Sequence, residues 1–334
     1  TANHGIKAND GIFINGGIIN VETTAAAAKG INCESHIIVN GGRTTVITTG
    51  NGTYDTTDKE AKGAAGIKAD STFTMNAGIV KLKSSGSGGK GLKADCPAII
   101  NGGELYVITT GSVFSSNNDT ASPKGVKIDD NLTINGGTIM VRTKGSKGEG
   151  IESKATLTIN DGTVLVSAYD DAVNSAGDLY IKGGNVTVVG TQNDGLDANG
   201  NMYISGGNIV AYGASGAEAG IDIDERHKLY ITGGNIFGIG GRVDGTLGST
   251  SQGIISTSGS VQANSTVSVS NGSSTVASFT MPPYSYNSGS IMISSPNLKS
   301  GTSYTLSLGS TTQTVTASNS VSSSMGGGFP GGRW

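Results

Sequence analysis

Charged residues, aromatic residues and cysteines are all scarce in this chain of 334 residues. Charged residues make up 14% of the chain and nearly balance, with 22 basic and 25 acidic side chains and a net charge of −3. A nucleic-acid-binding protein needs a basic surface that displaces counterions from phosphates, so this balance argues against a nucleic-acid partner. No run of about 18 apolar residues occurs, which argues against a membrane-spanning helix.

The motifs of common catalytic sites are also missing. The sequence contains no Gly-x-Ser-x-Gly, no Walker phosphate-binding loop and no His-Glu-x-x-His. Its three histidines, His4, His36 and His227, are too dispersed to form one base–nucleophile site. Its two cysteines, Cys33 and Cys96, are too few for a disulfide framework, and we expect both to be buried free thiols.

Glycine, in contrast, is abundant, with 55 residues. These glycines lack the three-residue period of collagen. Each glycine inside a helix costs about 1 kcal/mol, and the strand-favouring residues Thr, Val and Ile fill much of the remaining sequence. The composition therefore predicts an all-β fold.

The glycines belong to a repeat. Its first half resembles Ala65–Ala69, with the form x-Gly-Ile-x-Ala, and its second half resembles Leu132–Thr143, where Ile-Asn-Gly-Gly precedes alternating apolar residues. The glycine of the first half, or the residue in its place, recurs at positions 5, 30, 66, 91, 125, 150, 172, 195, 220 and 253. Six of the nine intervals are 22 to 25 residues long, and the other three are 33 to 36.

Three short strands and three turns fit this period, and that unit is one turn of a parallel β-helix. One turn cannot bury its own apolar side, so stacked turns supply the core. We predict an all-β, right-handed parallel β-helix (a β-solenoid) of about ten turns over residues 1–255, with a degenerate last copy at Gly253. Residues 256–324 are predicted to form a C-terminal antiparallel β-strand cap packed on the helix, and residues 325–334 a glycine-rich tail.

The three long intervals place extra residues in surface loops, at 48–64, 109–124 and 238–251. The first two occupy the same place in their turns, so they are predicted to protrude from one edge of the solenoid. Long loops on one edge of a solenoid usually shape a binding surface.

Stacking also turns each repeat position into a column of side chains. The column two residues after the repeat glycine reads Lys7, Asn32, Lys68, Lys93, Lys127, Glu152, Asn174, Asp197 and Asp222. Its lysines Lys68, Lys93 and Lys127 are candidate carbohydrate-binding residues that could hold the carboxylates of uronic acids. Each of them has an aspartate two positions later, so ordinary surface ion pairs are the alternative.

The later turns are acidic instead. The candidate metal ligands there are Glu149, Glu152, Asp170, Asp171, Asp194, Asp197, Asp222 and Asp224. Carboxylates stacked at about 5 Å repel one another, and their oxygens suit a hard cation, so we predict bound Ca²⁺. The alternative is a solvated acidic face with scattered lysine partners.

Tyr180, Tyr203 and Tyr230 occupy one outward position in three successive turns. Tyrosine rings stack on sugar rings and their hydroxyls form hydrogen bonds, so this strip is a second candidate carbohydrate-binding feature. Stacking that only supports the sheet is the alternative.

The repeat resembles that of a family of polysaccharide lyase-like bacterial β-helices described as carbohydrate-binding domain-containing proteins. The matching motifs are Gly66–Asp70, Gly91–Asp95 and Asp194–Asn199, and the similarity covers about residues 4–255, with a further likeness at 295–306. The resemblance implies binding of plant cell-wall polysaccharide, both cellulose and acidic sugars such as polygalacturonate (pectin), with calcium. Asp170–Val173 and Asn193–Asp197 faintly resemble two motifs of pectin-cleaving galacturonases, but in reversed order and without Gly-His-Gly and Arg-Ile-Lys, and the patterns of common pectate lyases are missing.

We therefore expect a calcium-assisted, non-catalytic carbohydrate-binding protein that is extracellular or attached to the cell surface. The chain begins inside a repeat without a signal peptide, so we expect a processed form. The alternative is a calcium-dependent pectate or polysaccharide lyase, in which Lys68, Lys93 or Lys127 would remove a proton beside the uronate carboxylate. The separation of most lysines from most acids along the chain favours binding. A purely structural rod ranks last.

Overall fold

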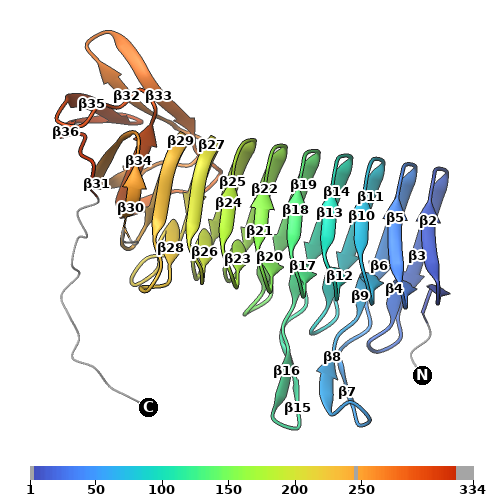
Figure 1. Ribbon diagram of the computed structural model, residues 1–334. Coiled ribbons are helices and arrows are strands. Elements are labelled where there is room, and N and C mark those ends of the chain that lie inside the picture. The colour runs from blue at the N-terminus through green and yellow to red at the C-terminus, as the bar shows by residue number, and fades with distance from the viewer. Residues whose placement is uncertain (1–3, 244–246, 321–334) are drawn as a thin grey trace.

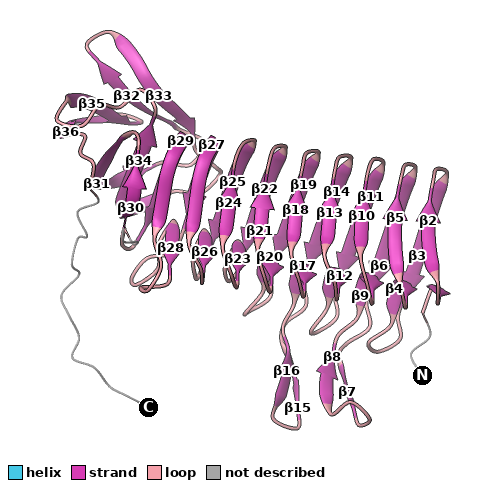
Figure 2. Ribbon diagram, viewed as in Figure 1, coloured by secondary structure: helices cyan, strands magenta, loops and turns pink. Residues whose placement is uncertain are grey.

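The computed structural model describes residues 4–243 and 247–320. All regular secondary structure in these residues is β-strand, and they contain no helix (Figures 1 and 2). The first strands of successive turns form a parallel sheet of nine. These strands are β1 (Ile6–Ala8), β4 (Lys29–Cys33), β9 (Ala65–Ala69), β12 (Lys90–Ala94), β17 (Lys124–Ile128), β20 (Glu149–Ser153), β23 (Val173–Ser175), β26 (Leu196–Ala198) and β28 (Ile221–Ile223).

The second and third strands of each turn form two further parallel ladders. The second strands are β2 (Gly11–Ile14), β5 (His36–Val39), β10 (Phe73–Met75), β13 (Ala98–Ile100), β18 (Leu132–Ile134), β21 (Leu157–Ile159) and β24 (Leu179–Ile181). The third strands are β3 (Ile18–Thr23), β6 (Arg43–Thr48), β11 (Ile79–Ser84), β14 (Glu104–Thr109), β19 (Thr138–Thr143), β22 (Thr163–Ala168) and β25 (Asn185–Gly190). In the last two turns, β27 (Met202–Tyr212) and β29 (Leu229–Gly240) each continue both ladders.

The predicted parallel solenoid is thus confirmed, with nine turns rather than about ten. The copy predicted at Gly253 begins β31 (Gly253–Val261), which pairs antiparallel with β34 (Tyr286–Ser295). β30 (Leu247–Thr250) adds a short parallel strand to β29. The tenth turn does not form because the returning β34 occupies the position beside β29 that it would take.

The C-terminal strands are antiparallel, as predicted. β32 (Thr266–Asn271), β33 (Ser274–Thr280), β35 (Ser303–Leu308) and β36 (Thr311–Thr316) form a four-stranded sheet. Its apolar side chains, such as Phe279 and Leu306, share a core with Tyr212 and Phe237 on the outer face of the last turns. The predicted tail, residues 325–334, lies outside the described residues.

Strand alternation builds the solenoid core. In β19, Ile139 and Val141 are buried while Met140 and Arg142 are exposed. One continuous cluster of such side chains runs from Ile14 to Met292, and each fully buried Ile or Leu contributes roughly 1.5–3 kcal/mol. Both cysteines are free thiols, although Cys96 is only half-buried. No described residue belongs to a helix that could span a membrane.

The turns after the third strands stack so closely that some positions accept only glycine. A Cβ atom on Gly86 would lie 1.9 Å from the carbonyl oxygen of Gly50 in the preceding turn. We expect Gly86→Ala to lower the free energy of unfolding by about 2 kcal/mol, as overpacking does, when measured by urea denaturation. Gly16→Ala is the matched control, because no atom lies within 4 Å of its Cβ position. Equal stability of the two variants would contradict this close stacking.

Candidate functional site

The predicted column, basic in the early turns and acidic in the later ones, is present on the outer face of the first-strand sheet. The strands pair in the register Lys7, Asn32, Lys68, Lys93, Lys127, Glu152, Asn174, Asp197 and Asp222. A second column, immediately before the repeat glycine, brings Lys29, Ala65, Lys90, Lys124 and Glu149 into register. The sheet therefore carries two parallel rows of lysines over turns two to five.

Two hairpins project from the edge of this sheet. The long loop 48–64 contains β7 (Thr53–Asp55) and β8 (Glu60–Lys62), and the loop 109–124 contains β15 (Phe114–Ser116) and β16 (Asp119–Ala121). Figure 1 shows both hairpins extending in the same direction, as predicted. The hairpins contact each other, since the Ala61 backbone N–H donates to Asp119 Oδ2 at 2.6 Å. They form one wall beside the two rows of lysines.

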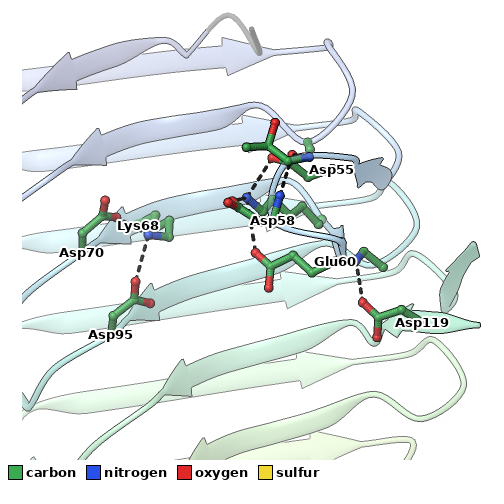
Figure 3. Close-up of polar contacts among 12 residues, drawn as sticks. Asp55, Asp58, Glu60, Lys68, Asp70, Asp95 and Asp119 are labelled. Carbon is green, nitrogen blue, oxygen red and sulfur yellow. Dashed lines mark hydrogen bonds and ion pairs between the residues drawn. The ribbon is translucent and has the colours of Figure 1, made fainter. Parts of the chain in front are cut away.

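A cleft of about 1000 Å³ lies between this wall and the sheet. Its floor holds six lysines, Lys29, Lys68, Lys90, Lys93, Lys124 and Lys127. Its wall presents the carboxylates Asp55, Asp58, Glu60 and Asp119, seen on the right of Figure 3. Long surface loops have thus created a concave, strongly charged site along several turns of the rod, which is the form of site that a polymer chain can enter.

The three lysines predicted from the sequence lie together on this floor. Lys68 pairs with Asp70 and lies 3.0 Å from Asp95 (Figure 3), and Lys93 lies 3.0 Å from Asp95. Lys127 pairs with Asp129 at 2.7 Å, and Lys93 reaches the same carboxylate at 3.4 Å. Burial lowers the pKa of Lys93, but Asp95 and Asp129 outweigh it and raise the pKa overall. The ion pairs of the alternative interpretation are present, and they line the cleft.

Two other floor lysines were not singled out by the sequence analysis. Lys90 Nζ donates to the carbonyl of Gly88 at 3.2 Å, and Lys29 Nζ donates to the carbonyls of Ala27 and Gly63 at 2.7 Å. Burial, reinforced by neighbouring lysines, lowers the pKa of Lys90 to about 7 and that of Lys29 to about 8. Their place before the repeat glycine was visible in the sequence. Their burial was not, because it depends on the walls of the cleft.

A buried ion cluster separates the basic turns from the acidic ones. Lys124 lies 2.5 Å from Glu149 and 3.5 Å from Glu152, and Lys154 also pairs with Glu152. Burial raises the pKa of Glu149 to about 7 despite Lys124, whereas the lysines hold the pKa of Glu152 below its ordinary value although burial opposes them. The Oε2 atoms of both glutamates are buried without a hydrogen-bond partner. These two predicted metal ligands therefore already have cationic partners.

Three more of the predicted ligands form a desolvated acidic ladder. Burial is the main cause that raises the pKa of Asp171 to about 6, that of Asp194 to about 7 and that of Asp197 to about 8, and neighbouring carboxylates add to it. Asn174 Nδ2 donates to Asp197 at 2.6 Å and to Asp171 at 3.3 Å. Asp194 accepts from the Ala219 backbone N–H at 2.6 Å. Only partial hydrogen bonding thus compensates for the crowded carboxyl groups.

The remaining predicted ligands have other partners. Asp170 accepts a hydrogen bond from Asn193, Asp222 pairs with Arg242 at 3.1 Å, and Asp224 pairs with Arg226 at 3.1 Å. In residues 4–243 and 247–320, no three or more His, Cys, Asp or Glu side chains are placed so that they could hold a metal ion as they stand. The eight acids therefore fall into separate groups.

The tyrosine strip lies on a different sheet from the cleft, on β24, β27 and β29. Ring centroids of Tyr180 and Tyr203 are 4.7 Å apart, those of Tyr203 and Tyr230 are 4.8 Å apart, and the planes differ by only 5° and 6°. Within the stack the rings cover one another's faces, so the strip presents mainly ring edges and hydroxyl groups. The structure does not bring these tyrosines and the floor lysines together.

Comparison of the sequence with known protein families identifies the family of this chain. A family model described as "Carbohydrate-binding domain-containing protein" matches residues 1–171. No curated protein and no solved structure matches the chain. The family match spans every residue that lines the cleft, from His4 to Lys154. Because the model matches more than half of the sequence, the chain belongs to the family of carbohydrate-binding domain-containing proteins.

Proposed function

We propose that this chain binds an acidic plant cell-wall polysaccharide, such as polygalacturonate, in the cleft, and that it does so outside the cell or at its surface. The cleft floor carries this proposal, because six lysines line one open groove of about 1000 Å³. Family membership supports a carbohydrate partner. Cellulose, which the family resemblance also implies, carries no charge for these lysines to recognise.

The site offers two kinds of contact to a uronic-acid chain. Lysine ammonium groups donate charge-assisted hydrogen bonds to carboxylates, and such bonds are stronger than neutral ones. Carboxylates on the wall, such as Asp58 and Asp119, can accept hydrogen bonds from sugar hydroxyls. Asp95 and Asp129 bridge Lys68, Lys93 and Lys127 by ion pairs, so at these lysines an acidic sugar would exchange one carboxylate partner for another. Binding of this kind weakens as salt screens the charges.

Titration of the protein with polygalacturonate in a calorimeter tests this function. We expect saturable heat that weakens several-fold between low salt and physiological salt, because the contacts are ionic. Cello-oligosaccharides in parallel measure the contribution of neutral glucan. Absence of binding to polygalacturonate would overturn the proposal, whatever the cello-oligosaccharides show.

A polysaccharide lyase is the second candidate, and Lys90 is the observation that favours it. A general base works best with a pKa near the working pH, and burial gives Lys90 a pKa of about 7. Its amine would take the proton α to the uronate carboxylate. The electron pair would form a carbon–carbon double bond as the glycosidic C–O bond at the β-carbon breaks, and the leaving sugar oxygen would take up a proton. Growth of the ultraviolet absorbance of the unsaturated product at trace protein concentration, and its loss in Lys90→Met, would establish this activity.

Calcium belongs to the proposal as a partner of the acidic ladder. The donor types fit, because Asp171, Asp194 and Asp197 offer desolvated oxygen ligands of the kind that Ca²⁺ prefers. When bound, the ion would supply the positive charge that these carboxylates lack. Their present spacing holds no metal group, so binding would require the side chains to close in and Asn174 to turn its amide oxygen inward.

A further inference from the structure

Lys29 and Lys90 differ from the other lysines of the cleft floor. Among the described residues, the floor lysines Lys68, Lys93, Lys124 and Lys127 each lie within 4 Å of a carboxylate. Within residues 4–243 and 247–320, Lys29 and Lys90 form no such ion pair, and their ammonium groups donate to backbone carbonyl groups only. An ammonium group has three donors, so one remains on Lys29 and two remain on Lys90.

The charges around these two groups are mainly of their own sign. Lys90, on β12, faces Lys93 on the same strand, Lys124 and Lys127 on β17, and Lys29 on β4. Lys29 faces Lys68 on β9, Lys93 on β12 and Lys62 on β8, with Asp70 as the opposing charge. The positive charge of the floor is therefore least compensated at these two positions, and both line the cleft.

We propose that Lys29 and Lys90 are the anion subsites of the cleft and that each is completed by a carboxylate of one bound uronic-acid polymer. The inference rests on the proposed function and specifies which residues bind the carboxylates of the polymer. Lys29 and Lys90 are two rungs apart with Ala65 between them, about 10 Å, which is too far for one carboxylate. The polymer therefore runs along the rod, parallel to the stacking of the turns.

Binding should take up protons, because Lys90 and Lys29 are partly neutral in the free protein. With a pKa of about 7 for Lys90 and about 8 for Lys29, roughly nine-tenths of Lys90 and half of Lys29 are neutral at pH 8. A carboxylate ligand favours the charged forms, so binding at pH 8 should take up roughly one to one and a half protons. The uptake should fade at pH 6, where both groups are already charged. The affinity should fall as pH rises above 7.

The test is calorimetric titration of polygalacturonate at pH 8 in two buffers that differ in protonation enthalpy. The difference in observed heat gives the number of protons taken up. We expect Lys90→Met and Lys29→Met each to weaken binding about tenfold and to reduce the uptake, because each removes a charge-assisted hydrogen bond. Lys90→Arg should retain binding and lose the share of proton uptake due to Lys90, since arginine stays charged. Lys83→Met, on β11 and outside the cleft, is the matched control.

Other ligands define the chemistry that is recognised. Fully methyl-esterified polygalacturonate should not compete, whereas a sulfated dextran that competes equally, with the same uptake, would show that any polyanion suffices and would overturn the assignment to uronate. Inorganic phosphate and monomeric galacturonate should bind far more weakly than the polymer, because each reaches one subsite only. Normal polygalacturonate binding by both methionine variants, or wild-type binding without proton uptake at pH 8, would overturn this inference and leave the proposed function intact. Failure of wild type to bind polygalacturonate would overturn the proposed function itself.

Discussion

Removal of the two hairpins should abolish polysaccharide binding and leave the solenoid folded. Deleting Gly52–Lys62 shortens the segment Thr48–Ala65 to the length of the next turn, Ser84–Lys90, which occupies the same register. Deleting Val113–Ala121 does the same for the later loop. Without its wall the cleft becomes a flat face, and the desolvation that strengthens lysine–carboxylate contacts is lost. We expect at least about a 100-fold loss of affinity for polygalacturonate, equal to about 2.7 kcal/mol.

Deleting either hairpin alone should also weaken binding, because the two hairpins support each other through the hydrogen bond between Ala61 and Asp119. Asp119→Ala should therefore loosen the wall and weaken binding less than either deletion. Circular dichroism and thermal unfolding check that the rod remains folded, which we expect because the shortened turns copy native ones. Full affinity in the double deletion would place the polysaccharide elsewhere, and the tyrosine strip would be the next surface to test.

The fold was predictable because a solenoid repeats its constraints. Alternation such as that of Ile139 and Val141 sets the inward face of a strand, and recurrence of the pattern every turn fixes which strands stack. The tenth turn was predicted wrongly for a reason outside the repeat. Gly253 carries the motif, yet β34 returns from later in the chain and pairs with β31. A local motif holds no information about such a distant competitor.

The register and the loops of the candidate site were predictable from the sequence, and its electrostatics were less so. The register of Lys68, Lys93 and Lys127 followed from the repeat, and the protruding loops followed from their extra length. What the sequence could not show was that the loops would pair with each other and enclose a cleft. Lys29 and Lys90 line that cleft, and burial lowers the pKa values of both. Desolvation depends on three-dimensional surroundings, so it leaves no signature in residue order.

The acidic ladder should make the protein more stable at pH 5 than at pH 7. Folding raises the pKa values of its Asp171, Asp194 and Asp197 to about 6, 7 and 8, well above those of unfolded carboxyl groups. Glu149, in the neighbouring ion cluster, adds to the effect with a pKa of about 7. The folded state therefore binds more protons than the unfolded state between about pH 4 and pH 8, so stability falls as pH rises through this range. Lys90 and Lys29 act in the opposite direction only from about pH 7 upward, because their pKa values are lowered.

Thermal unfolding in matched buffers measures this effect. For Asp194 alone, the change from pH 7 to pH 5 is worth about 2 kcal/mol, and we expect a rise in Tm of about 5 °C or more. Asp194→Asn keeps the acceptor for the Ala219 N–H and removes the charge. This variant should be more stable than wild type at pH 7, and its advantage should shrink by about 2 kcal/mol at pH 5. A Tm that increases from pH 5 to pH 7 would contradict the burial of the ladder.

Calcium should act on the same groups at pH 7, where they begin to lose their protons. A cation that binds only the folded state stabilises it in proportion to the logarithm of its concentration. Millimolar Ca²⁺ should therefore raise Tm at pH 7 and have little effect at pH 5. The rise in Tm should be larger with Ca²⁺ than with Mg²⁺, which requires a stricter coordination geometry. Asp197→Asn should abolish the shift, whereas Asp55→Asn, in the hairpin, should retain it. If Ca²⁺ leaves Tm unchanged while the pH effect is present, the carboxyl groups are kept neutral by protons, and the calcium proposal is wrong.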